Sequence, residues 1–252
     1  HKKISIITVT KNSEKYLEKN ILSVNKQKYK NYEHIIIDGK SNDKTIKIIK
    51  KHKKKIKYFI SEKDNGLYDA MNKGIKKSTG DIIGILNSDD VYYNETLDIV
   101  NKYFNKYKKL DFLFGSVLKH KLLHGYYPKK IKWSFGFYST HSVGFFIKKE
   151  AHKKVGFYNT KYKYSADYDL FYRLIVKKKM NGMATKKDEV FGKFRSGGLS
   201  SRIRYIDFLK ECTQIRLDNK QNFFIVYLIF FARLLRNFKK ILKWKLLFVF
   251  VL

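Results

Sequence analysis

Two adjacent carboxylates, Asp89 and Asp90, directly follow an apolar run at 82–86 in a chain with few acidic residues, 22 Asp+Glu against 55 Lys+Arg. Neighbouring carboxylates repel each other, and a divalent cation relieves that repulsion. Oxygen ligands at a strand end suit Mg²⁺ or Mn²⁺ shared with the phosphates of a substrate. The alternative is a simple turn, or a polar lead into the next helix.

The elements before this pair alternate in type. β-branched runs predict strands at 4–9, 32–37, 56–60 and 82–86, and apolar residues at helical spacing predict helices at 17–24, from about 45, and at 67–75 with Gly80 as their stop. Asn12-Ser13 is expected to cap the first helix. This alternation predicts an α/β fold, a doubly wound and mostly parallel sheet with helices on both faces.

Polar residues stand where each of these strands should end. They are Thr10, Asp38, Asp64 and the Asp89-Asp90 pair. In parallel α/β sheets, ligands bind beyond the carboxyl ends of the strands. The pattern therefore predicts that four separate segments meet at one edge of the sheet and form one cleft.

The second half is less regular. A helix is expected at 96–107, strands at 112–117 and 142–147, a helix opening at 166–169, and helical structure from about 203. A carboxylate at a helix start beside a cleft, such as Asp167, is well placed as a general base. Asp169 is explained in part by the helix dipole. His141 is equally well explained as a packed strand residue.

Two phosphate-binding motifs are not supported. Gly39-Lys40-Ser41 lacks the glycine five positions earlier, where His34 stands, and no Gly-x-Gly-x-x-Gly follows the first strand. Only seven of the 55 basic residues are Arg, whereas nucleic-acid readers favour Arg, so no nucleic-acid partner is expected. Cys212 is the single cysteine, which fits a reducing, cytoplasmic compartment. The first apolar run is too short for a signal-peptide core.

Five segments in order resemble the inverting family-two glycosyltransferases of the bacterial surface-polysaccharide type, which have the GT-A fold. The resemblance covers about residues 4–201. The segments are SIITVTKN, EHIIIDGKSNDKT, EKDNGLYDAMNKGIKKSTGDIIGILNSDD, SADYDLFYRL and FRSGGLS. The expected catalytic domain is 1–202, with a nucleotide-sugar half at about 1–90 and an acceptor half at about 91–202.

The resemblance implies a role for each candidate residue. Asp38 and Asp64 would contact the base or ribose of a nucleotide sugar, a UDP-sugar by expectation, with Thr10 beside them. Asp89 and Asp90 would hold Mn²⁺ or Mg²⁺ on the diphosphate, and Asp89 would also contribute to donor binding. Asp167 would be the base that activates a hydroxyl of a glycan or lipid-linked acceptor. The pair Gly197-Gly198 suits a lid over the donor.

Two positions depart from the family pattern: Asn87 stands where many members have Asp, and Ala166 where the family has Glu.

Two other functions are alternatives to glycosyl transfer. A nucleotidyltransferase of similar fold also needs paired carboxylates, but usually a Gly-rich basic loop after the first strand, which is absent. The second alternative is a basic nucleic-acid-binding module, which the net charge of +33 suggests.

The tail at 203–252 is both apolar and basic. Phe223–Ala232 is an uninterrupted apolar run ended by Arg233, too short to cross a bilayer alone. Leu234, Leu235, Phe238, Ile241 and Leu242 share one helical face. We expect a helix in the plane of a membrane surface, which would place the enzyme at the inner face of the membrane. Packing on the catalytic domain, or in a homodimer, is the alternative.

Overall fold

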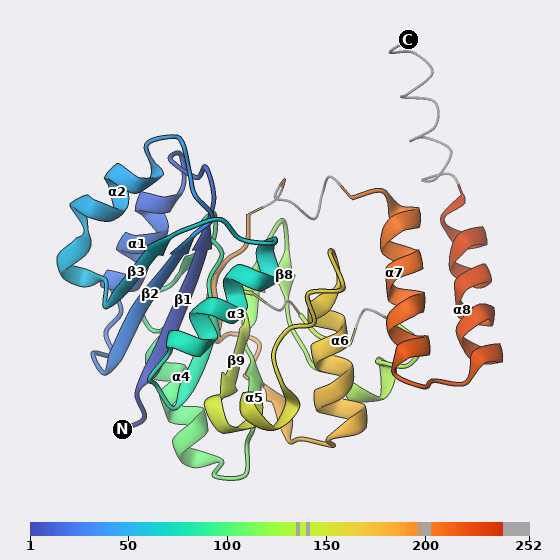
Figure 1. Ribbon diagram of the computed structural model, residues 1–252. Coiled ribbons are helices and arrows are strands. Elements are labelled where there is room, and N and C mark those ends of the chain that lie inside the picture. The colour runs from blue at the N-terminus through green and yellow to red at the C-terminus, as the bar shows by residue number, and fades with distance from the viewer. Residues whose placement is uncertain (135–136, 140–141, 196, 198–202, 239–252) are drawn as a thin grey trace.

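The computed structural model describes residues 1–252 except 135–136, 140–141, 196, 198–202 and 239–252. A seven-stranded sheet forms its centre (Figure 1), in the order β10-β6-β9-β4-β1-β2-β3. These strands are β1 (Ile4–Thr10), β2 (Tyr32–Asp38), β3 (Tyr58–Ser61), β4 (Ile82–Ile85), β6 (Phe112–Phe114), β9 (Phe145–Lys148) and β10 (Gly182–Ala184). Only β9 runs antiparallel to its neighbours, so the mostly parallel α/β sheet is confirmed.

Helices cover both faces of this sheet. They are α1 (Leu17–Asn25), α2 (Thr45–Lys51), α3 (Leu67–Lys77), α4 (Thr96–Lys106), α5 (Lys149–Val155) and α6 (Ala166–Tyr172). Side chains alternate across a strand, so Ile7 of β1 packs with α3, α5 and α6, while Ile4 and Ile6 pack with α1 and α4. The alternation gives two buried layers, one on each side of the sheet.

A second sheet lies beside the first, in the order β5-β11-β7-β8. Its strands are β5 (Val91–Tyr92), β7 (Ser116–Leu118), β8 (Leu122–Leu123) and β11 (Val190–Lys193). The single strand expected at 112–117 was therefore wrong, because the chain leaves one sheet and enters the other at Gly115. A Cβ at this glycine would overlap the Phe191 ring, so the crossing requires a residue without a side chain.

Three smaller expectations also need correction. Ser13 does not cap α1 with its side chain: its carbonyl accepts from the backbone N–H groups of Tyr16 and Leu17, and α1 begins without a side-chain cap. α3 ends at Lys77, before Gly80. β9 begins at Phe145 rather than at 142.

Two long helices, α7 (Tyr205–Asp218) and α8 (Phe223–Arg236), form a hairpin at the C-terminal side (Figure 1). α7 contributes Cys212 and Ile215 to the core that also holds α6. The boundary at residue 202 stays a prediction, but α7 shares a core with the helices that cover the large sheet. Within the described residues, no helix has both the length and the apolar character to cross a bilayer.

Candidate active site

The ends of β1, β2 and β3 meet at one edge of the large sheet. Thr10 is in register with Asp38, and the N–H of Gly39 donates to the Thr10 carbonyl at 2.9 Å. Asp64 lies against Gly39 so closely that a Cβ there would overlap its Oδ2 atom. The predicted meeting of these segments is confirmed.

Asp38 is fully buried at this edge. Its carboxylate accepts hydrogen bonds from the Ser41 N–H at 2.9 Å, the Ser41 hydroxyl at 2.5 Å and the Ser61 hydroxyl at 2.6 Å. These bonds tie the turn after β2 to the end of β3. In this arrangement Asp38 holds the turn at this edge of the sheet, and its direct contact with a nucleotide stays a prediction.

Asp64 and Thr10 have side-chain oxygens with fewer hydrogen bonds within the protein than those of Asp38. Asp64 is partly exposed, and its Oδ1 atom accepts the Gly66 N–H at 3.0 Å. The Thr10 hydroxyl is buried without a hydrogen-bond partner among the described residues. A buried polar atom without a partner is costly, so the Thr10 hydroxyl is suited to meet a polar group of a ligand. The partly exposed Asp64 carboxylate can also accept from one.

The Asp89-Asp90 turn follows β4 and is held by hydrogen bonds from the Asn20 side chain of α1. The Asn20 amide donates to the carbonyls of Asn87 at 2.8 Å and of Asp90 at 2.9 Å, and it accepts from the Thr8 hydroxyl at 3.1 Å. Sequence reasoning missed Asn20. The available signal was its place on the apolar face of α1, where a fully buried amide is unexpected.

The two carboxylates of this turn have different surroundings. The Asp90 carboxylate is buried and accepts the Arg195 N–H at 2.9 Å and the Ser142 hydroxyl at 3.3 Å. Burial, with the adjacent charge of Asp89, raises the pKa of Asp90 to about 7. Asp89 is 23% exposed and lies 3.5 Å from the Arg195 guanidinium.

Arg195 itself was not among the predicted site residues. Its guanidinium stacks on the Tyr16 ring at 3.9 Å from the centroid, and it comes from the FRSGGLS segment that follows β11. Arg195 therefore contacts both carboxylates of the turn, Asp89 through its guanidinium and Asp90 through its backbone N–H. Gly198 of the expected lid and His141 lie outside the described residues.

The residues of this turn fit a divalent cation that shares its ligands with a substrate. No group of three His, Cys, Asp or Glu side chains is gathered for a metal in the described part of the chain. Mg²⁺ is commonly held by one or two carboxylates together with substrate phosphates and water, which Asp89 and Asp90 could supply. The Asn87 Oδ1 atom, buried without a partner, adds an oxygen at the same turn.

Asp167 lies at the start of α6 and is bonded to both halves of the catalytic fold. It accepts hydrogen bonds from the Tyr68 hydroxyl at 3.1 Å and the Tyr138 hydroxyl at 3.3 Å. Burial, and then the charge of Asp167, raises the pKa of both tyrosines well above the usual range. Tyr68 is in the first turn of α3, four residues after Asp64, so it links Asp167 to the strand-end cleft.

The loop before Asp167 is fastened by Glu211 of α7. The Glu211 carboxylate accepts the backbone N–H groups of Lys163 at 2.8 Å, Tyr164 at 2.7 Å and Ser165 at 2.6 Å. Sequence reasoning assigned this region to the tail and gave no signal for the contact. α7 therefore fixes the approach to the α6 N-terminus.

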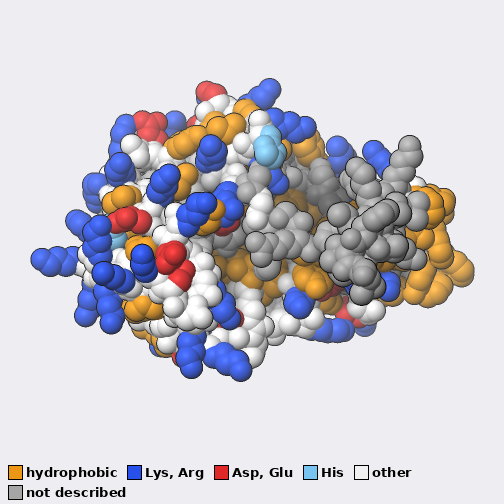
Figure 2. Space-filling view, turned by 90° about the horizontal axis from the view of Figure 1, so that it is seen from above, with side chains coloured by type: hydrophobic (Ala, Val, Ile, Leu, Met, Phe, Trp, Pro, Cys, Tyr) orange, Lys and Arg blue, Asp and Glu red, His pale blue; other side chains and the backbone are white. Residues whose placement is uncertain are grey.

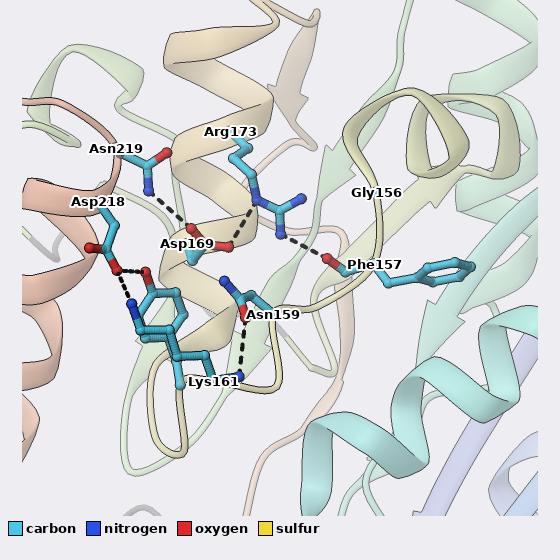
Figure 3. Close-up of a pocket in the computed structure, with 9 residues that line it drawn as sticks. Gly156, Phe157, Asn159, Lys161, Asp169, Arg173, Asp218 and Asn219 are labelled. Atoms are coloured by element: carbon cyan, nitrogen blue, oxygen red, sulfur yellow. Dashed lines mark hydrogen bonds and ion pairs between the residues drawn. The ribbon is translucent and has the colours of Figure 1, made fainter.

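Asp169 has a structural role. Its oxygens bond to Arg173 Nε at 2.9 Å and Asn219 Nδ2 at 3.0 Å, beside an open pocket of about 540 Å³ between α6 and the end of α7 (Figure 3). Asp218, in the same pocket, pairs with Lys161 at 2.8 Å. None of the predicted site residues lines this pocket, and these bonds join α6 to the helical hairpin.

Comparison with known proteins shows the family of this chain. The model of the family described as glycosyl transferase family 2 matches residues 5–164. A relative in Rickettsia typhi, described as an uncharacterized glycosyltransferase, is 32% identical over 187 residues, which cover 68% of this chain and 58% of the relative. The chain belongs to glycosyl transferase family 2. It spans little more than half the length of that relative.

Solved structures of similar fold include two with nucleotide sugars. S. aureus TarS 1–349 in complex with UDP-GlcNAc has a TM-score of 0.68 at 19% identity, covering 85% of this chain and 66% of that one. The mannosyltransferase PcManGT from Pyrobaculum calidifontis, in complex with GDP-Man and Mn²⁺, has a TM-score of 0.67 at 16% identity, covering 88% and 65%. These matches confirm the GT-A fold.

Proposed function

We propose that this protein is a metal-dependent inverting glycosyltransferase. It moves a hexosyl or N-acetylhexosaminyl group from a nucleotide-diphosphate donor to a hydroxyl of a glycan or lipid-linked acceptor. The observation that carries this proposal is the Tyr68–Asp167 hydrogen bond. It joins a carboxylate of the acceptor half to the helix that begins at the donor-side strand end, so that one cleft holds both.

In the proposed reaction, Asp167 accepts the proton of the acceptor hydroxyl as this oxygen attacks the anomeric carbon. The attack comes from the face opposite the departing nucleotide, and the configuration therefore inverts. Tyr68 and Tyr138 hold the carboxylate in place through its two oxygens. Two bonds from separate elements limit its rotation, which keeps the base aligned with the hydroxyl.

Donor binding is assigned to the strand-end cleft. Thr10 and Asp64 provide polar atoms toward the nucleoside, Asp38 supports the turn between them, and Asp89 and Asp90 would hold Mn²⁺ or Mg²⁺. When bound, the cation neutralises charge that grows on the leaving diphosphate. A uridine nucleotide is the proposed donor; TarS was solved with UDP-GlcNAc and PcManGT with GDP-Man.

The proposed setting is synthesis of surface polysaccharide, including lipopolysaccharide, at the cytoplasmic face of the membrane. A lipid-linked acceptor is presented at a bilayer, and the apolar, basic C-terminal region suits contact with a membrane surface. A homodimer through the same region is the competing arrangement.

A donor panel tests the reaction. UDP-, GDP- and dTDP-sugars are titrated into the protein with Mn²⁺ and again with a chelator, and binding and sugar release are measured. We expect binding of one nucleotide class that needs the cation. Absence of cation-dependent binding across the panel would refute the proposal.

The base is tested separately. Asp167→Asn should abolish transfer and leave donor affinity nearly unchanged, because the amide cannot take the proton. Asp188→Asn, which removes an exposed carboxylate away from the proposed site residues, is the matched control and should transfer at the normal rate. Undiminished transfer by Asp167→Asn would remove Asp167 from the mechanism.

A further inference from the structure

Helix α8 has apolar side chains on two opposite faces. Val226 and Ile229 are buried against the rest of the molecule. Large apolar side chains on the other side remain exposed, and we call them, together with Phe238 two residues after the helix end, the outer stripe: Phe224 (80% exposed), Leu228 (70%), Phe231 (55%), Leu235 (75%) and Phe238 (54%). Their spacing of four, three, four and three residues places them along one line of a helix.

The outer stripe needs a covering surface. A helix that is apolar all round is normally buried, and a contiguous exposed apolar patch marks an interaction site. Figure 2 shows hydrophobic side chains gathered at the end of the molecule where α8 lies, while Lys and Arg are spread over the part formed by the large sheet and its helices. The stripe is thus distinct from the rest of the visible surface.

The charge around the stripe identifies what covers it. From Asn219 to Phe238, the part of the tail that the structure describes, the sequence contains three basic residues, Lys220, Arg233 and Arg236, and no Asp or Glu; the sequence of 239–252 adds four Lys and no acid. A second copy would bring two such segments together and place like charges side by side, which is unfavourable. Anionic lipid headgroups attract Lys and Arg, and apolar side chains enter the adjacent acyl region.

A neighbouring segment carries the same combination of side chains. Residues 129–133 include exposed Lys129, Lys130 and Lys132, and Trp133 is 54% exposed. The segment is fastened beside α8 by bonds from Gln221 to the Lys132 carbonyl and from Arg233 to the Trp133 carbonyl, each 3.0 Å. Trp is enriched at membrane–water interfaces, so this segment matches the same partner.

We propose that the outer stripe of α8 docks on an anionic lipid bilayer, with the helix lying in the plane of the membrane. Its 14 residues span about 21 Å at 1.5 Å each, less than the roughly 30 Å of a hydrocarbon core. The docking surface depends on α8 and its surroundings, so it stands or falls separately from the proposed transfer reaction.

The position of α8 also suits a lipid-linked acceptor. α8 packs against α7, and α7 carries Glu211, which holds the loop before Asp167. The hairpin that meets the bilayer is therefore the element that fixes the acceptor side of the cleft. This link is the one part of the inference that rests on the proposed function.

Vesicle co-sedimentation of the full chain tests the docking surface. The double variant Leu228→Gln/Leu235→Gln removes two exposed leucines and keeps good helix formers. The matched control, Leu22→Gln/Tyr107→Gln, removes two exposed apolar side chains from α1 and the end of α4. Binding is measured on phosphatidylcholine vesicles with and without phosphatidylglycerol, and circular dichroism checks the folding of each variant.

The wild type and the control should bind phosphatidylglycerol vesicles equally, and the α8 variant should bind them roughly tenfold or more weakly. Binding should weaken without the anionic lipid. Equal binding by the α8 variant would overturn the proposal. A second result would also overturn it: no vesicle binding, together with light scattering that shows a dimeric wild type and a monomeric α8 variant. This result would assign the stripe to a second copy of the chain.

Discussion

The side-chain nitrogen of Asn20 lies 2.9 Å from the carbonyl oxygen of Asp90, and the same amide group holds the carbonyl of Asn87. A single buried side chain of α1 therefore closes both ends of the turn that carries the two carboxylates. The position of a metal-binding turn depends on such supporting bonds as much as on its ligands.

Asn20→Ala should loosen this turn. It leaves the Asp90 carbonyl without the donor it has here, while the Asn87 carbonyl keeps the Asp90 N–H and the Thr8 hydroxyl keeps the His34 ring nitrogen. We expect a cost of about 1–3 kcal/mol in the free energy of unfolding. Mn²⁺-dependent donor affinity should fall about 10- to 100-fold, measured by calorimetry at a temperature where the variant is folded. Lys19→Ala, its exposed neighbour on α1, should change neither quantity. Normal donor affinity in folded Asn20→Ala would show that donor binding does not need the hydrogen bonds from Asn20 to this turn.

Asp90→Asn should stabilise the metal-free protein at alkaline pH. The pKa of Asp90 is raised to about 7 in the folded state, so the folded form holds a proton that the unfolded form releases near pH 4. The contribution of the Asp90 carboxyl to the free energy of unfolding is fully present below pH 4 and is lost as the pH rises toward 7. An amide carries no charge and avoids this loss, which is on the order of 2–4 kcal/mol at pH 8.

Thermal unfolding at pH 5 and pH 8 measures this difference. Asp89→Asn is the matched variant, because Asp89 is partly exposed, and its stability should change little. Mn²⁺ with donor should raise the melting temperature of the wild type and fail to raise that of Asp90→Asn. A less stable Asp90→Asn at pH 8 without cations would contradict the burial argument.

Gly39→Ala should displace Asp64 without unfolding the protein. The added methyl group would overlap the Asp64 Oδ2 atom, the end of a side chain that can rotate away. We expect donor affinity to fall several-fold while the melting temperature stays close to the wild-type value. Gly66, where a Cβ would meet nothing within 4 Å but φ is +110°, provides the contrast: Gly66→Ala should lower stability through backbone strain. An unchanged donor affinity in Gly39→Ala would argue against a role for Asp64.

The sheet and the meeting of its strand ends could be predicted because they depend on local patterns. β-branched runs, helical spacing and a polar residue at each strand end are all readable in order, and parallel topology then brings Thr10, Asp38 and Asp64 together. The supporting contacts could not be predicted in this way. Asn20 reaches residues 67 and 70 positions away, and such pairs depend on how helices pack on the sheet.

The break at Gly115 and the role of α7 were missed for a similar reason. An apolar run at 112–117 reads as one strand until the Phe191 ring, 76 positions on, requires the glycine. The pattern of α7 predicts a helix but not that its carboxylate reaches the loop before α6. Local sequence specifies the elements, while the partners across the core decide where each one begins and what it supports.

Glu211 is expected to act on the reaction through Asp167 rather than on the donor. Its carboxylate accepts from three consecutive backbone N–H groups just before α6, so its loss frees the segment that leads to Asp167, the proposed base. A misplacement of about 1 Å can cost on the order of 100-fold in rate. Glu211→Ala should therefore lower kcat about 10- to 100-fold and leave the donor Kd unchanged.

Glu211→Gln keeps one acceptor oxygen and should retain an intermediate rate. Glu150→Gln, an exposed control on α5, should be normal. A folded Glu211→Ala with normal kcat, or one whose donor Kd rises as much as kcat falls, would show that Glu211 does not position the base.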